Sequence, residues 1–161
     1  MISPHFSLSD VLIRLLKKDD VMYSHLWAQH ASRMQNYYSQ QEQGRRLVFV
    51  ATYRECIVGY VSLHFISDDP VFSSRDIPEI VDLNVSQPYH NRGIGAALIK
   101  ACEEKARDIG WTIIGIGVEL EPEYAAAQHL YPKLGYMPIE DVSQKDIWSL
   151  YKRLLQTDLM C

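Results

Sequence analysis

The chain has 161 residues and a formal net charge of −4, with 47% hydrophobic and 22% charged residues. This composition is ordinary for a soluble globular protein, and the length suits a single domain, residues 1–161, that buries its own core. A negative net charge without any basic run argues against a nucleic-acid partner. No apolar stretch approaches the roughly 20 residues that cross a bilayer, which argues against a membrane partner.

The N-terminus and the cysteines predict the compartment. Residues 1–5 lack the basic and apolar parts of a signal peptide. Cys56, Cys102 and Cys161 are scattered, and an odd cysteine count without a secretion signal indicates reduced thiols. We therefore expect a cytoplasmic protein. Neither these cysteines nor the six histidines show metal-ligand spacing, so we expect no metal.

The first 42 residues predict a strand followed by helical structure. Apolar residues over 11–16 indicate the strand, and Asp19 and Asp20 supply acidic residues for a helix start. Residues 20–42 are then typical of one or two helices. The residues expected to face inward are Met22, Leu26, Trp27, Ala31 and Met34.

The next segment predicts a hairpin and a loop. Two apolar runs, 47–53 and 57–65, flank a short turn at Arg54 and Glu55 and predict an antiparallel pair of strands. Aspartates, serines and prolines over 66–78 predict a loop.

A strand over 80–85 is expected to lead into a helix from Ile94 to Ile109, with Gly110 as its C-cap. Helical spacing turns one set of side chains inward and another toward water. The inward set is Ile94, Ala97, Leu98, Ala101, Cys102 and Ile109, and the outward set is Lys100, Glu103, Glu104 and Arg107. Because Cys102 belongs to the inward set, we do not expect it to be a nucleophile.

The remaining residues predict a strand over 111–118, a helix opening at Pro122 and reaching Tyr131, and a final strand pair over 136–139 and 147–154. The whole order is β-α-α-β-β-β-α-β-α-β-β. One mixed sheet with helices on its faces buries all of these elements, so we predict an α/β (α+β mixed-sheet) fold.

Residues 83–98 combine a strand, a polar turn and a glycine-bearing helix start. The first N–H groups of a helix have no intrahelical partner, and the helix dipole adds partial positive charge at the same end. Gly93 and Gly95 lack Cβ atoms, so a ligand can approach the backbone itself. This combination predicts a site for a phosphate or pyrophosphate group.

Two motifs resemble those of the GNAT superfamily of acetyl-CoA-dependent N-acetyltransferases. His90-x-x-Gly93-x-Gly95 is similar to the family's Gln/Arg-x-x-Gly-x-Gly/Ala, and the segment from Ala127 to Tyr136 is similar to its Ala-x-x-Leu-Tyr-x-x-Leu-Gly-Phe/Tyr. The two motifs follow in the family's order, and the match covers residues 80–139. The resemblance implies a mixed, mostly antiparallel GNAT-like sheet with helices on both faces. It also implies direct transfer of an acetyl group from acetyl-CoA to a primary amine.

The resemblance assigns roles in binding acetyl-CoA. It implies that Leu83, Asn84 and Val85 pair with the pantetheine arm by strand addition, and that a backbone N–H near Val85 faces the thioester carbonyl. The residues implied to bind the pyrophosphate are His90, Asn91, Arg92, Gly93, Ile94, Gly95 and Ala96.

Three positions depart from the family pattern. His90 replaces the usual Gln or Arg, and Arg92 is the nearest permanent cation that can take over part of its role. Tyr124 stands near the second motif, where an asparagine is common. Pro132 lies inside the second motif's helix, which is therefore expected to end or kink near Tyr131.

The resemblance makes Tyr131 the candidate general acid for the departing thiolate, with a packed core tyrosine as the alternative. For the base, strand alternation places Asp82 and Asn84 on one face of the strand. Asp82 is the candidate base that accepts the amine's proton. The alternative is that its carboxylate faces water or makes a structural hydrogen bond. The rival bases are Glu79, Glu119 and Glu121.

Several alternatives remain at this point. The expected acceptor is a small primary amine, but a protein N-terminus or lysine is also open, as is a module that binds acetyl-CoA without turnover. A dinucleotide-binding fold is disfavoured because Leu98 occupies the position of its third glycine. A homodimer is the default expectation for the oligomeric state.

Overall fold

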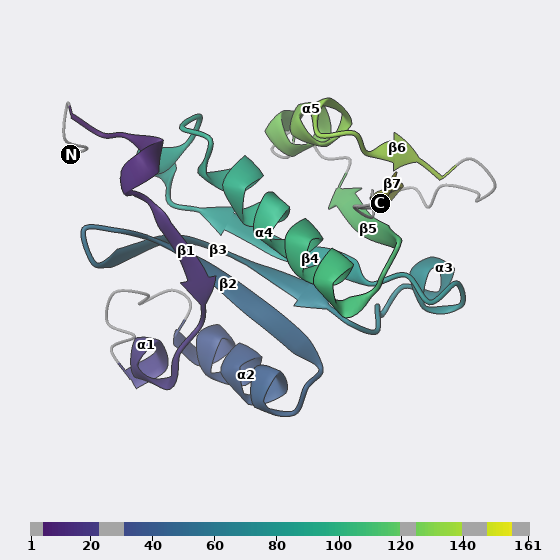
Figure 1. The fold of residues 1–161 in the computed structure, drawn as a ribbon, viewed down its shortest axis with the longest axis horizontal. Helices are drawn as coiled ribbons and strands as arrows, with labels where there is room; N and C mark the ends of the chain where they lie inside the picture. Colours follow the sequence, from purple (N-terminus) through teal and green to yellow (C-terminus); the bar gives the residue numbers. More distant parts are fainter. Residues whose placement is uncertain (1–4, 23–30, 120–124, 140–147, 156–161) are drawn as a thin grey trace, which may run out of the picture. The chain divides into compact units, whose positions relative to one another are not determined.

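The computed structural model describes residues 5–22, 31–119, 125–139 and 148–155 (Figure 1). The elements in chain order are η1 (Leu8–Asp10), β1 (Leu12–Leu15), α1 (Lys18–Met22), α2 (Ala31–Glu42), β2 (Arg46–Tyr53), β3 (Cys56–His64), α3 (Pro70–Ser73), β4 (Glu79–Val85), η3 (Gln87–Tyr89), α4 (Ile94–Ile109), β5 (Ile113–Glu119), α5 (Ala125–Lys133), β6 (Met137–Pro138) and β7 (Trp148–Leu154).

The strands form a seven-stranded sheet in the order β1-β2-β3-β4-β5-β7-β6. The β4–β5 pair is parallel, and the pairs β1–β2, β2–β3, β5–β7 and β6–β7 are antiparallel. The predicted mixed, mostly antiparallel sheet is therefore confirmed. The chain divides into two compact units, residues 1–64 with 82–102 and residues 65–81 with 103–161. A single domain over residues 1–161 stays a prediction.

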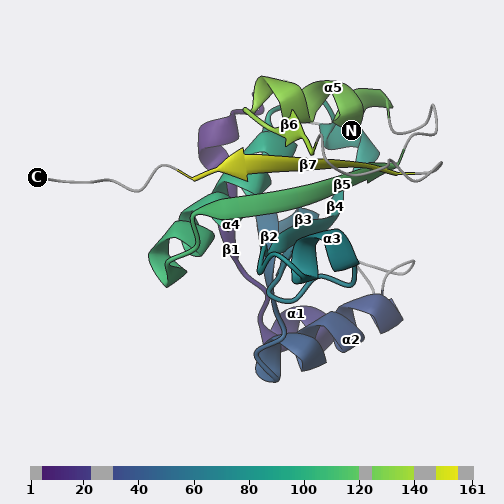
Figure 2. The same ribbon diagram turned by 90° about the vertical axis from the view of Figure 1, so that its right-hand side faces the viewer.

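In the first unit, β2 and β3 pack against α2, and α1 lies beside α2 (Figures 1 and 2). The predicted hairpin of β2 and β3 closes through Arg54 and Glu55, which have φ angles of 50° and 65°. A two-residue turn with both residues left-handed matches the right-handed twist of the two strands that it joins. The core on this side contains Leu16, Met34, Tyr37, Val48, Val50 and Tyr60.

Helices cover both faces of β3 in this unit. Tyr60 packs with Met34 and Tyr37 of α2. Its neighbour Gly59 points the other way, where a Cβ atom would lie 3.3 Å from Leu98 Cδ1 of α4. Successive strand residues face opposite sides of a sheet, so α2 and α4 lie on opposite faces.

In the second unit, β5 and β7 run side by side, with β6 along β7 (Figure 2). The prediction of an irregular loop over 66–78 is wrong in part, because this segment contains α3. Asp69 caps α3 by accepting a hydrogen bond from the Val71 N–H at 2.9 Å. Phe72 is fully buried with Ile77 and Ile139, and this apolar contact holds the short helix in place.

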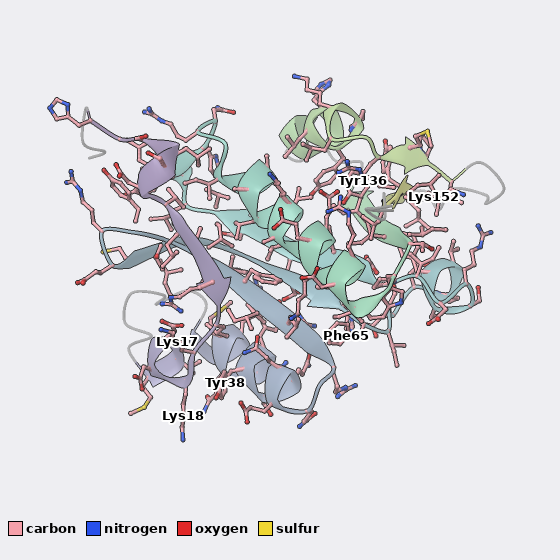
Figure 3. All side chains as sticks on the ribbon, in the orientation of Figure 1. Lys17, Lys18, Tyr38, Phe65, Tyr136 and Lys152 are labelled. Carbon is pink, nitrogen blue, oxygen red and sulfur yellow. The ribbon has the colours of Figure 1, made fainter. Side chains whose placement is uncertain are left out.

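The helix α4 has the predicted bounds, and Gly110 follows it with a φ angle of 113°. Cys102 is buried as expected, but two other assignments are wrong. Glu103 is only 4% exposed, because its carboxylate accepts a hydrogen bond from Tyr136 Oη at 3.0 Å (Tyr136 is labelled in Figure 3) and another from Arg153. Ile109 is 48% exposed, since it lies in the last turn, where the helix leaves its packed surface.

Two further expectations concern helix ends and packing. Met34 is fully buried as predicted, whereas Met22 is 69% exposed at the end of the short α1. Helix α5 does not stop at Tyr131 but continues through Pro132 to Lys133. A proline so close to the C-terminus of a helix removes one hydrogen bond from the final turn only. Pro122, Tyr124, Leu26 and Trp27 lie outside the described residues.

Candidate functional site

The backbone of the glycine loop contains two left-handed residues just before α4. Asn91 and Gly93 have φ angles of 59° and 87° and flank Arg92. Left-handed residues in such alternation turn successive N–H groups toward one point, which makes an anion-binding nest. Ala97 N donates to Gly93 O at 3.1 Å, so the amides of Ile94, Gly95 and Ala96 precede the first intrahelical bond. These donors and the dipole of a 16-residue helix suit a phosphate group.

A segment before β1 lies against this loop, which the sequence did not predict. The position of a Cβ atom on Gly93 is 3.1 Å from Leu8 Cδ2. The guanidinium of Arg92 lies 5.7 Å from the ring centroid of Phe6, and that ring contacts Tyr53 and Tyr89 at 5.0 and 5.9 Å. The side chain of Arg92 is therefore drawn toward an aromatic group. Two apolar residues ahead of the first strand were the only signal for this contact.

His90 bonds back to the strand that precedes the loop. Its Nε2 atom is 2.6 Å from the carbonyl oxygen of Val85. A carbonyl can only accept, so His90 donates through Nε2. The residue at the family's Gln or Arg position thus links the loop to β4.

The strand β4 carries a local backbone irregularity at Asp82. This residue has a φ angle of 59°, although exposure still alternates over 81–85, and Asp82 and Asn84 are the two exposed residues of this stretch. A left-handed conformation costs a residue other than glycine about 1–2 kcal/mol, and Asp and Asn tolerate it best. After β4, the Ser86 N–H donates to Val58 O at 2.8 Å, which holds the end of β4 against β3.

The carboxylate of Asp82 belongs to a polar cluster on the α2 side of the sheet. Arg46 Nη1 donates to Asp82 Oδ2 and to Ser62 Oγ, each at 3.1 Å. The Arg46 guanidinium also lies 4.3 Å from the ring centroid of Tyr37. Tyr37 donates a hydrogen bond to Asp82, and its pKa is raised, first by burial and then by the negative charge of Asp82. Asp82 is therefore a carboxylate held by two donors.

Sequence reasoning missed Arg46. In the sequence it is a single arginine at the start of an otherwise apolar strand. An arginine in this position is also common at the exposed end of a strand, so it does not indicate burial. In the structure Arg46 is only 7% exposed. A buried guanidinium needs a nearby anion, and Asp82 supplies it.

The other candidate residues belong to the second unit. Tyr131 is 5% exposed, and burial raises its pKa to about 12. Its ring centroid lies 6.1 Å from that of Tyr136. Glu79 accepts a hydrogen bond from Ser67 Oγ at 2.5 Å, and Glu121 lies outside the described residues. Asp82, Leu83–Val85 and the loop of residues 90–96 belong to the first unit, whereas Tyr131 belongs to the second.

Within the described ranges, no three His, Cys, Asp or Glu side chains are arranged to hold a metal ion. In the same part of the chain, every helix is too short or too polar to cross a membrane.

Comparison with known proteins identifies the family. The model of the acetyltransferase (GNAT) family matches residues 12–136, so the chain belongs to this family. No curated protein matches the chain.

Solved structures share the fold at low sequence identity. A ribosomal-protein-alanine N-acetyltransferase from Brucella melitensis superposes with a TM-score of 0.68 at 21% identity, covering 89% of this chain and 99% of its own. The PaiA N-acetyltransferase from Thermoplasma acidophilum, in complex with coenzyme A, gives 0.65 at 15% identity, with 89% and 98% covered. A spermidine N-acetyltransferase chimera from Vibrio cholerae and hSSAT gives 0.66 at 15% identity, with 91% and 96% covered.

Proposed function

We propose that the protein is an N-acetyltransferase that moves an acetyl group directly from acetyl-CoA to a primary amine. The observation that carries this proposal is the nest at Asn91–Gly93, which runs into the N-terminus of α4 directly after β4. Family membership supports it, and so does the coenzyme A bound to the related PaiA enzyme. Acetyl-CoA, when bound, supplies an acetyl group activated as a thioester.

The chain's own backbone holds the donor in this proposal. The amides of Gly93, Ile94, Gly95 and Ala96 bind the pyrophosphate, while Leu83, Asn84 and Val85 pair with the amide-bearing arm. These groups fit their roles because the loop offers donors to an anion and the strand offers both donors and acceptors to amides. Asn91 shapes the nest through its left-handed conformation. Arg92 and His90 are secondary contacts, since Arg92 lies over Phe6 and His90 bonds to Val85 O.

Two side chains act as general base and general acid in this proposal. A lysine-like amine has a pKa near 10.4, so it needs a group that accepts its proton before it can attack. Asp82 takes that role in our proposal, directly or through water. Tyr131 donates its phenolic proton to the departing thiolate. Its buried hydroxyl, with a pKa of about 12, stays protonated at neutral pH and is therefore available as a donor, although a weak one.

A small molecule is the proposed acceptor. The relatives described above include enzymes named for a ribosomal-protein alanine and for spermidine, so the fold serves both kinds of acceptor. A protein acceptor is the second candidate. A module that binds acetyl-CoA without turnover is the third, and absence of thiol release with every amine would favour it.

Calorimetric titration with acetyl-CoA, with NAD as a control ligand, tests the proposal first. We expect micromolar binding of acetyl-CoA alone, and release of free thiol when an amine acceptor is added. Gly95→Leu should weaken acetyl-CoA binding strongly by blocking the amides of the first turn, whereas Lys100→Leu, on the exposed side of the same helix, should not. Normal binding by a folded Gly95→Leu variant would show that the pyrophosphate is placed wrongly.

A further inference from the structure

The polar cluster around Asp82 contains more positive than negative charge. Arg46 and Arg33 contribute two guanidinium groups and Asp82 contributes one carboxylate. Arg33, on α2, hydrogen-bonds to the hydroxyl of Tyr60 and interacts electrostatically with Asp82, and the bond to Tyr60 is the main cause of its raised pKa. His64, the register partner of Arg46, adds no negative charge. The cluster therefore carries an excess of one positive charge.

The cluster also lacks a hydrogen-bond acceptor. Arg46 Nε is buried and, among the residues that the structure describes, has no hydrogen-bond partner. Buried donors without partners are rare, because leaving one unpaired costs about 1–3 kcal/mol. Arg46 as a whole is more than nine-tenths buried, so its charge is fixed in place beside Asp82. An additional anionic group beside the cluster would offset its excess positive charge.

Two members of the cluster are accessible. The side chain of Asp82 is 37% exposed, and Arg33 is exposed on the surface of α2. A carboxylate and a guanidinium that share Tyr37 and Tyr60 as neighbours offer opposite charges to one ligand. A polycation would gain from Asp82 alone and would be repelled by both arginines.

We propose that the acceptor is an amine that also carries a carboxylate, of the amino-acid class, with its amine at Asp82 and its carboxylate recognised by Arg33 in the field of Arg46. This inference rests on the proposed acetyltransferase function. Guanidinium groups suit the carboxylate of such an acceptor, because their planar donors match a carboxylate and they stay charged at every physiological pH. The buried Arg46 keeps Asp82 in place, and the exposed Arg33 makes the direct contact.

The experiment compares amino acids with their C-terminal amides and with spermidine as acceptors, using thiol release from acetyl-CoA to measure kcat/KM. For the wild type we expect amino acids to exceed their amides by roughly 10-fold, the value of a hydrogen bond to a charged group. Arg33→Gln should bring this ratio close to one. Lys100→Gln removes the same charge from α4, on the opposite face of the sheet, and should leave the ratio unchanged.

The outcomes separate this inference from the function on which it rests. Turnover of spermidine or of the amides in preference to amino acids would overturn the acceptor class and leave the acetyltransferase intact. A ratio that Arg33→Gln does not change would also overturn it. Acetyl-CoA binding without thiol release for any acceptor would overturn the proposed function itself. Arg33 is exposed, so its replacement does not put the folding of the protein at risk.

Discussion

Gly59 on β3 offers a direct test of the strand that we assign to the donor. A Cβ atom at this position would lie 3.0 Å from the carbonyl oxygen of Asn84, 3.3 Å from Leu98 Cδ1 and 3.4 Å from Val85 Cγ2. Ordinary contacts are at 3.5–4.0 Å, so Gly59→Ala must displace these neighbours by a few tenths of an ångström. One of them is backbone of β4, which cannot swing away as a side chain does.

The expected magnitude follows from these distances. Overpacking by one methyl group costs about 1–3 kcal/mol of unfolding free energy. A shift of Asn84 and Val85 removes the equivalent of one hydrogen bond to the donor, worth about 0.5–1.5 kcal/mol, which corresponds to roughly 2- to 13-fold weaker acetyl-CoA binding. Urea denaturation measures the first effect and calorimetry the second.

Gly115→Ala is the matched control. A Cβ atom there would meet three carbon atoms of the Phe72 ring at 2.6–2.8 Å, within the core of the second unit. We expect it to destabilise the protein by about 1–3 kcal/mol without changing the affinity of the folded protein for acetyl-CoA. If Gly59→Ala also left that affinity unchanged while destabilising the fold, the donor would not lie along Leu83–Val85 and the reasoning would be refuted.

Three further predictions concern single side chains. Asp82→Asn should lower kcat by about 100-fold or more if Asp82 accepts the proton, and an unchanged kcat would remove it from the mechanism. Tyr131→Phe should lower kcat by about 10- to 100-fold and spare the affinity for acetyl-CoA. Because the pKa of Tyr131 is about 12, this loss should be equal at pH 7 and pH 9, and a loss confined to one of them would contradict the role. Glu103→Ala should cost about 1–3 kcal/mol in urea denaturation, because it removes the buried carboxylate that accepts hydrogen bonds from Tyr136 Oη and Arg153, and a cost below about 1 kcal/mol would show that these two bonds add little to stability.

The spacing of apolar residues along helices and strands predicted most of the fold. The bounds of α4 were predicted correctly because its apolar spacing and Gly110 indicate the same helix end. The hairpin of β2 and β3 was predicted correctly because two apolar runs flank a two-residue turn. Glu103 was misplaced because spacing alone cannot show that a carboxylate finds two donors from later segments of the chain. The helix α3 was missed because its four residues are too short to show any period.

The candidate site was predictable only where backbone chemistry has a sequence signature. Glycines at 93 and 95 after a strand indicated the loop, and its left-handed backbone is the conformation that glycine favours. The Arg46–Asp82 pair joins residues 36 positions apart, and nothing local in the sequence links them. The left-handed conformation of Asp82 was equally hidden, because β4 otherwise has the alternation of a regular strand.

The bond from His90 to Val85 O uses the Nε2 donor of the imidazole ring. A neutral ring that donates through Nε2 keeps a lone pair on Nδ1, and a lone pair repels an anionic oxygen. In the neutral tautomer that donates through Nε2, His90 therefore presents no second donor to an anion. In the proposed function, recognition of the pyrophosphate then depends on main-chain amides, whose number and direction no side-chain replacement can alter unless it changes the path of the backbone.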